Sequence, residues 1–133
     1  MSAERALLSA IREALLDHAP LQALSGDRIY DDPPADVVFP YITIGRVESR
    51  PADTASRDAI EHAITLHAWS RYGGRAETLE IIAALRAALH NAPLTLAGHN
   101  LVLLLATFAD VFRSGDGRTT HGVLRVRAVT EPQ

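Results

Sequence analysis

The stretch AIEHAITLHAW, from Ala59 to Trp69, sets the expected fold of this chain of 133 residues. Apolar and polar side chains alternate along it, as they do on a strand whose neighbours point to opposite faces. One face collects Ile60, Ile64, Leu66 and Ala68 with His62; the other collects Glu61, Thr65, His67 and Trp69 with Ala59 and Ala63. The stretch therefore predicts a long strand with one apolar face.

Three further extended segments surround this strand. Tyr41 to Glu48 alternates in the same way, and the polar stretch from Arg50 to Arg57, which contains Pro51, is typical of a mobile loop between two strands. Thr119 to Val129 is expected to return from Leu101 to Phe112 through a hairpin turn at Asp116-Gly117. The leucine run at residues 101–105 fits a buried helix equally well, but the flanking glycines favour a strand.

Two amphipathic helices complete the pattern. The first is capped by Ser2, carries apolar residues at helical spacing as far as Leu15, and is expected to end at Pro20. The second runs from about Ala76 to His90. Its predicted apolar stripe comprises Leu79, Ile82, Leu85, Ala88 and Leu89.

The element order α, β, β, α, β, β predicts an α+β fold in a single domain, residues 1–133. We expect an antiparallel or mixed β-sheet of about four main strands, with the two amphipathic helices packed on one face. In the last strand, Leu124, Val126 and Ala128 share one face, while Arg125 and Arg127 occupy the other.

The composition excludes several classes of chemistry. All 13 basic residues are arginine, so a Walker phosphate loop, a Schiff-base lysine and a Ser–Lys dyad are excluded. Cysteine is absent, and the net charge of −3 is scattered, which gives no electrostatic footprint for nucleic acid. The charged start of the chain does not resemble a secretory signal, and the longest apolar run is too short to cross a bilayer. We therefore expect a soluble product and no membrane partner.

The candidate catalytic and ligand sites are weak. His62 and His67 are five residues apart on one strand, so they point to opposite faces and cannot share a metal ion; the other histidines lie in separate elements. Ser70 is interpreted as a strand-end serine that bonds to the backbone, and Gly73-Gly74 as a plain turn. Trp69 is expected to be buried against a helix rather than to stack on RNA. We predict no metal, no cofactor and no enzymatic activity.

The sequence resembles the tail-completion proteins of siphophages and gene transfer agents, which are also called tail terminators or head–tail joining proteins. The resemblance covers nearly the whole chain, in order and with similar spacing. It rests on these stretches: Gly26-Asp27-Arg28-Ile29-Tyr30, Pro40-Tyr41-Ile42-Thr43-Ile44-Gly45, His62 to Ser70 leading into the helix after Gly74, and Asp116 to Arg127.

The resemblance implies a structural role in the neck of a virion tail, with assembly in the bacterial cytoplasm. Members of this family form a ring, usually hexameric, on the head-proximal end of the tail tube. The ring stops tube growth and offers a surface to the head connector or stopper protein, and DNA passes through it. The implied partners are further copies of the chain, the tail tube protein and the head–tail connector. The family offers no catalytic residues to transfer.

Ring closure requires a heterologous interface, which we expect at strand edges or outer faces. The predicted interface residues are Tyr41, Arg46, Glu48, Arg50, Asp53, Arg57, Asp58, Glu61, Trp69, Arg125 and Arg127. The acids Asp31, Asp32 and Asp36 form a solvated acidic rim and are predicted to line the channel, where they would repel DNA phosphates. The free protein is expected to be monomeric or weakly associated, with the tube end as the template for the ring.

Three alternatives remain open. One is another phage neck component, such as a connector or stopper protein. A second is a small RNA- or ligand-binding α+β module, which exposed Trp69, Arg71 and Arg125 would favour. A third is a cofactor-free hydrolase, which would need a deep pocket that holds a histidine beside Ser70 or an acid.

Overall fold

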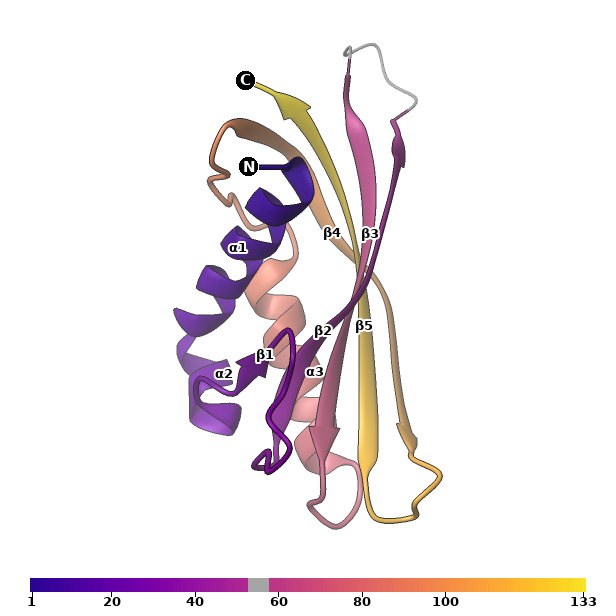
Figure 1. Cartoon of the computed structure of the whole chain (residues 1–133). Helices are drawn as coiled ribbons and strands as arrows, with labels where there is room; N and C mark the ends of the chain where they lie inside the picture. The colour runs from indigo at the N-terminus through magenta and orange to yellow at the C-terminus, as the bar shows by residue number, and fades with distance from the viewer. Residues whose placement is uncertain (53–57) are drawn as a thin grey trace.

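The computed structural model describes residues 1–52 and 58–133. Within these ranges the chain forms three helices and five strands (Figure 1). In chain order they are α1 Ala3–Leu16, α2 Ala19–Ser25, β1 Ile29–Tyr30, β2 Tyr41–Pro51, β3 Ile60–Ser70, α3 Ala76–Leu89, β4 His99–Arg113 and β5 Thr120–Pro132.

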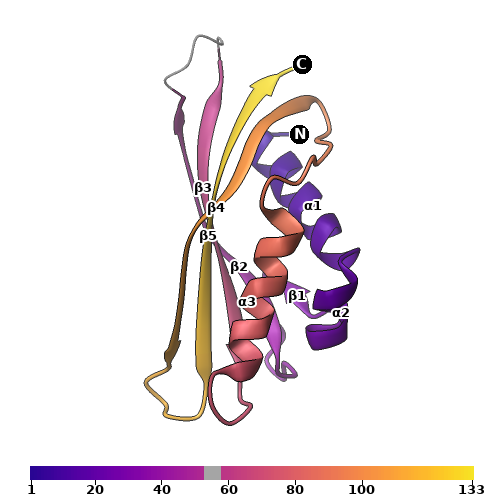
Figure 2. The same ribbon diagram turned by 180° about the vertical axis from the view of Figure 1, so that it is seen from behind.

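The strands form one sheet in the order β1-β2-β3-β5-β4. Strand β1 runs parallel to β2, and the other neighbours are antiparallel. All three helices lie on the same side of the sheet, as the two opposite views show (Figures 1 and 2). The predicted α+β class is confirmed; the two-residue strand β1 and the short helix α2 add to the four strands and two helices that the sequence indicates.

The first helices show how local chemistry sets helix ends. Ser2 caps α1 as predicted, because its hydroxyl accepts a hydrogen bond from the Arg5 amide at 3.1 Å. Pro20, however, does not simply end a helix. It lies in the first turn of α2, where a missing N–H group costs nothing. The segment Ala19–Ser25 is therefore a second, short helix.

Helix α3 covers the middle of the sheet, and its predicted stripe is only partly right. Leu79 is 51% exposed, whereas Ile81, which the stripe omits, is completely buried. A Cβ atom at Gly122 of β5 would lie 2.8 Å from the Thr78 Cγ2 atom and 2.9 Å from the Ile82 Cγ1 atom. The helix therefore packs on β5 at a distance that only a glycine permits.

Strands β2, β4 and β5 are longer than their sequence patterns indicate. Strand β2 continues to Pro51, and Arg50 pairs with Glu61 of β3, so the predicted loop loses its first two residues to the sheet. The predicted loop residues Asp53 and Arg57 lie outside the described ranges. The leucine run belongs to β4, so the strand interpretation is confirmed and the helix alternative is wrong.

The core lies between the helices and the inner face of the sheet, which we define as the face toward the helices. Ile64, Leu66 and Ala68 of β3 are completely buried there. His62 is also completely buried, and both of its ring nitrogens are hydrogen-bonded at 2.9 Å, to the hydroxyl groups of Ser49 and Thr130. The imidazole therefore fits into the core because neither nitrogen lacks a partner.

Candidate functional site

The outer face of the sheet, which points away from the helices, has no covering layer within the described residues (Figure 1). Its side chains stand in rows that cross the strands. Near the lower end, as drawn in Figure 1, the row consists of Tyr41, Trp69, His121 and Phe112, which the strand register places side by side. We call these four residues the aromatic row. A large uncovered face with an aromatic row is the feature of this chain most typical of an interaction surface.

The rings of the aromatic row are stacked from strand to strand. Tyr41 and Trp69 have ring centroids 6.2 Å apart, and Trp69 and His121 are stacked at 3.9 Å. Phe112 lies 4.8 Å from His121, and Phe39, just before β2, packs edge-on against Tyr41 at 5.0 Å. These neighbour contacts hold the row rigid without help from a helix.

The position of Trp69 corrects the prediction that it packs against a helix. Its side chain lies on the outer face, half-buried between Tyr41 and His121, and its Nε1–H group donates to the Thr43 hydroxyl at 3.0 Å. Because rings that stack across neighbouring strands stand upright on the sheet, they present edges rather than faces outward. A nucleobase needs a free ring face, so this arrangement does not favour the RNA-binding alternative.

Two histidines that the sequence places far apart meet beside the aromatic row. The His67 Nδ1 and His121 Nε2 atoms are 2.7 Å apart, so one ring donates a hydrogen bond to the other. Burial lowers the pKa of both groups below the ordinary histidine value, and the neighbouring His67 lowers the pKa of His121 further. The two nitrogens therefore share one proton, and no group of three metal-binding side chains exists among the described residues.

The other end of the outer face is charged. Arg127 Nε donates to the Glu61 carboxylate at 3.0 Å, and this hydrogen bond lowers the pKa of Glu61. The Arg125 guanidinium lies 4.7 Å from the centroid of the Phe108 ring, a cation–π contact. Arginine side chains that lie flat against aromatic and acidic neighbours are common in protein interfaces.

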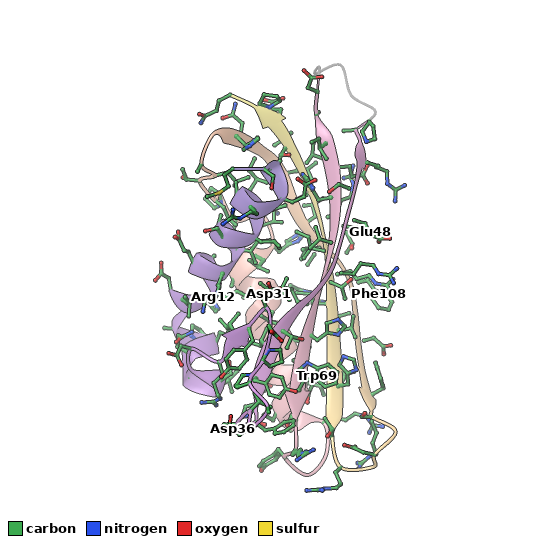
Figure 3. The ribbon with its side chains drawn as sticks, viewed as in Figure 1. Arg12, Asp31, Asp36, Glu48, Trp69 and Phe108 are labelled. Atoms are coloured by element: carbon green, nitrogen blue, oxygen red, sulfur yellow. The ribbon has the colours of Figure 1, made fainter. Side chains whose placement is uncertain are left out.

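The structure brings most of the predicted interface residues onto one surface. Glu48 and Phe108 both project from the outer face in Figure 3, although they come from strands at opposite sides of the sheet. Eight predicted residues belong to β2, β3 or β5 and lie on or beside this face: Tyr41, Arg46, Glu48, Arg50, Glu61, Trp69, Arg125 and Arg127. His121, Phe108 and Phe112, which the prediction does not include, lie on the same face, where the strand register places them.

The other predicted residues that the structure describes lie away from this face. Asp58 is exposed, with a positive φ of 59°, where the chain enters β3, while Asp53 and Arg57 fall outside the described ranges. Asp31, Asp32 and Asp36 are all exposed in the segment between β1 and β2, at the edge of the sheet. Figure 3 shows Asp31 and Asp36 at separate points of this segment, so they form a spread acidic rim rather than a carboxylate cluster.

Ser70 and the Ser49–His62 pair make hydrogen bonds that fit structural roles. Ser70 accepts a hydrogen bond from the Tyr72 amide, as predicted, and donates one to the Glu77 carboxylate at 2.7 Å. The Ser49–His62 pair has the hydroxyl of Thr130 on the second ring nitrogen, where a catalytic triad requires an acid. Asp116 accepts hydrogen bonds from the Thr119 and Arg118 amides, which lower its pKa to about 2, so it acts as a turn residue.

None of the described helices combines the length and the apolar character needed to span a membrane. The candidate functional site is therefore the uncovered face of the sheet, with its aromatic row and its paired charges. Such a surface can bind another macromolecule.

Comparisons with known proteins agree with this geometry. Residues 9–131 match the model of a family described as "Tail completion protein gp17". A relative from Bacillus phage SPP1, with the same description, is 33% identical over 127 residues, which cover 94% of this chain and 92% of the relative. A chain in the virion of a native gene transfer agent particle has a TM-score of 0.90 at 27% identity, with 98% of both chains covered. The structure of the SPP1 gp17 protein has a TM-score of 0.64 at 31% identity, covering 95% of this chain and 89% of that one.

Proposed function

Because this chain belongs to the tail completion protein gp17 family, we propose that it is a structural protein of a phage or phage-derived virion that forms a ring at the head-proximal end of the tail tube. The ring, a hexamer, ends tube growth and presents its free side to the head connector. Tail tube protein, connector and further copies of the chain are its partners, and DNA passes through it.

One observation carries this proposal. The chain has the same shape, over 98% of its length, as a chain in an assembled gene transfer agent virion. It matches that chain more closely than it matches the SPP1 protein, although its sequence is slightly more similar to the latter. A conformation shared with a chain inside a particle supports a role inside a particle.

The outer face supports the assembly role by its chemistry. A ring needs one patch on each subunit to meet a different patch on the next subunit or on the tube. The aromatic row supplies rigid apolar contact area, and Arg46, Glu48, Glu61 and Arg127 supply charges farther along the same face. We place the contact with the tube on this face, with the β2–β3 hairpin reaching toward the next component. The free chain remains monomeric until the tube end brings copies together.

The DNA channel requires a surface that does not hold phosphates. Asp31 and Asp32 are exposed, and we propose that they face the channel and repel the passing DNA. A particle map with arginines rather than these carboxylates along the bore would contradict this assignment.

Deletion of the gene, followed by electron microscopy of the particles, tests the proposal. We expect tails that are overlong or detached from heads, and a plasmid copy of the gene should restore joined particles. If the deletion strain releases normal joined particles, the proposal is wrong. If tails have the correct length but heads lose their DNA, the chain acts as another neck component, such as a stopper.

A further inference from the structure

The two edges of the sheet differ in shape and charge at the lower end of the molecule as drawn in Figure 1. On the β1 edge, residues 31–40 form a loop that we call the acidic arm. On the opposite edge, a groove of about 360 Å³ lies between α3 and the lower half of β4. Figure 1 shows the arm in front, and Figure 2, seen from behind, shows α3 in front at the same level.

The acidic arm presents a hydrophobic side chain among acids. Val38 is 60% exposed, although valine is usually buried. Asp31, Asp32 and Asp36 are exposed as well, and none of them forms an ion pair within residues 1–52 and 58–133. The base of the arm is fixed, because Arg28 Nε donates a hydrogen bond to the Pro40 carbonyl at 2.8 Å. The arm is therefore anchored at its base and exposes an apolar side chain, that of Val38, to solvent.

The groove presents the complementary surface. Leu79, which is 51% exposed, lines it together with Ala83 and Val111. Arg75 and Arg86 lie on its α3 side, both exposed and with no ion pair to another described residue. Asp110 is the acid on its β4 side. An apolar floor beside two free arginines fits a segment that carries an apolar side chain next to carboxylates.

Strand β4 leaves this part of its edge open. Higher up, the loop after α3 covers the edge: the Ala106 amide donates to His90 Nδ1 at 3.0 Å, and the Asn91 amide donates to the Leu104 carbonyl at 2.9 Å. The groove begins below Ala106, where β5 is the partner of β4 in the described sheet. A long edge strand with apolar neighbours can bind another chain unless something covers it.

We propose that the acidic arm of one copy docks into the α3–β4 groove of the next copy, with Val38 against Leu79 and Asp36 facing Arg75 and Arg86. The two surfaces lie on opposite edges of one subunit, so the contact is heterologous and repeats around a ring. This inference rests on the ring proposed above and names its subunit-to-subunit contact. It assigns Asp36 to the interface between copies, while Asp31 and Asp32 keep their place at the channel.

Cysteine cross-linking tests the contact directly, because the chain has no cysteine of its own. Val38→Cys and Leu79→Cys, combined in one chain, should form disulfides between subunits in purified oxidised particles, visible as a ladder on a non-reducing gel. Each single variant should give no ladder. Val38→Cys with Val102→Cys is the matched control, since Val102 is also exposed on β4 but lies above the groove.

A charge reversal gives a second, independent readout. Asp36→Arg should reduce the yield of joined particles about tenfold, and adding Arg86→Glu should restore most of it. If joined particles form but the Val38–Leu79 pair gives no ladder, the arm docks elsewhere and this inference is wrong, although the ring remains. If deletion of the gene leaves joined particles unchanged, the proposed function itself fails.

Discussion

The side chains on the inner and outer faces of the sheet are stabilised in different ways. On the inner face, Ile64, Leu66 and Leu124 are completely buried under the helices, and the polar His62 is bonded on both sides. On the outer face, side chains are supported only by their lateral neighbours, as in the stack of Trp69 on His121. The inner face is complete within one subunit, whereas the outer face leaves apolar edges in water. One face therefore stabilises the fold, and the other is the exposed surface on which the proposed contacts would lie.

The largest difference between the faces should appear when a core side chain is removed. Leu66→Ala leaves a cavity under the helices and should lower the free energy of unfolding by about 2–5 kcal/mol in urea titrations. Phe108→Ala on the outer face, where the ring is 44% exposed, should cost only about 0.5–1 kcal/mol through its contact with Arg125. Equal losses would mean that the outer face is also part of the core.

The next largest effect concerns the close approach of α3 to the sheet. Gly122→Ala puts a methyl group within 3 Å of Thr78 and Ile82, and should cost about 1–3 kcal/mol in thermal or urea unfolding. Gly73→Ala is the matched control, since a Cβ atom there meets nothing within 4 Å. A destabilised Gly73→Ala variant beside an unchanged Gly122→Ala variant would refute the packing described here.

Lowering the pH should reduce the free energy of unfolding, because three histidines have lowered pKa values in the folded state. Burial lowers the pKa of His67, His121 and His62 in the folded state, although Asp110 raises that of His121 and Glu4 raises that of His62. The unfolded chain therefore binds protons first. The contribution of these groups is complete above the ordinary histidine pKa of about 6.5 and is lost as the pH falls toward the lowered values.

Urea midpoints measured between about pH 7.5 and about pH 5.5 should therefore fall with pH. Replacing the outer-face pair, with His67→Gln and His121→Gln together, should make this dependence shallower. We assign the pH dependence that remains in this variant to His62. A pH dependence that the double replacement does not change would mean that the pair does not titrate between these limits.

The smallest effect on stability is expected from the outer ion pair. Glu61→Gln weakens its charge-assisted hydrogen bond with Arg127, but water surrounds both groups, so the unfolding midpoint should hardly move. If this face contacts a partner, the same variant should lower the fraction of tails joined to heads in electron micrographs. If the variant loses stability but still joins tails to heads, this ion pair stabilises the fold and does not contact a partner.

The main helices and strands of this protein could be predicted from local sequence patterns. Alternation at residues 59–69 fixes β3 and its two faces, because a side-chain period of two belongs to a strand. Ser2 fixes the start of α1, and Asp116 with Gly117 fixes the turn between β4 and β5, since each acts on a backbone group a few residues away.

The tertiary structure alone decided which distant residues meet. His67 and His121 are hydrogen-bonded across β3 and β5, and Phe112 joins the aromatic row from β4, because the strand order places β5 between β3 and β4. It likewise placed Trp69 on the uncovered face, and the acidic arm and the α3 groove at opposite edges. The physical reason is that periodicity and capping are local, whereas strand order and register arise from packing the whole chain against one core.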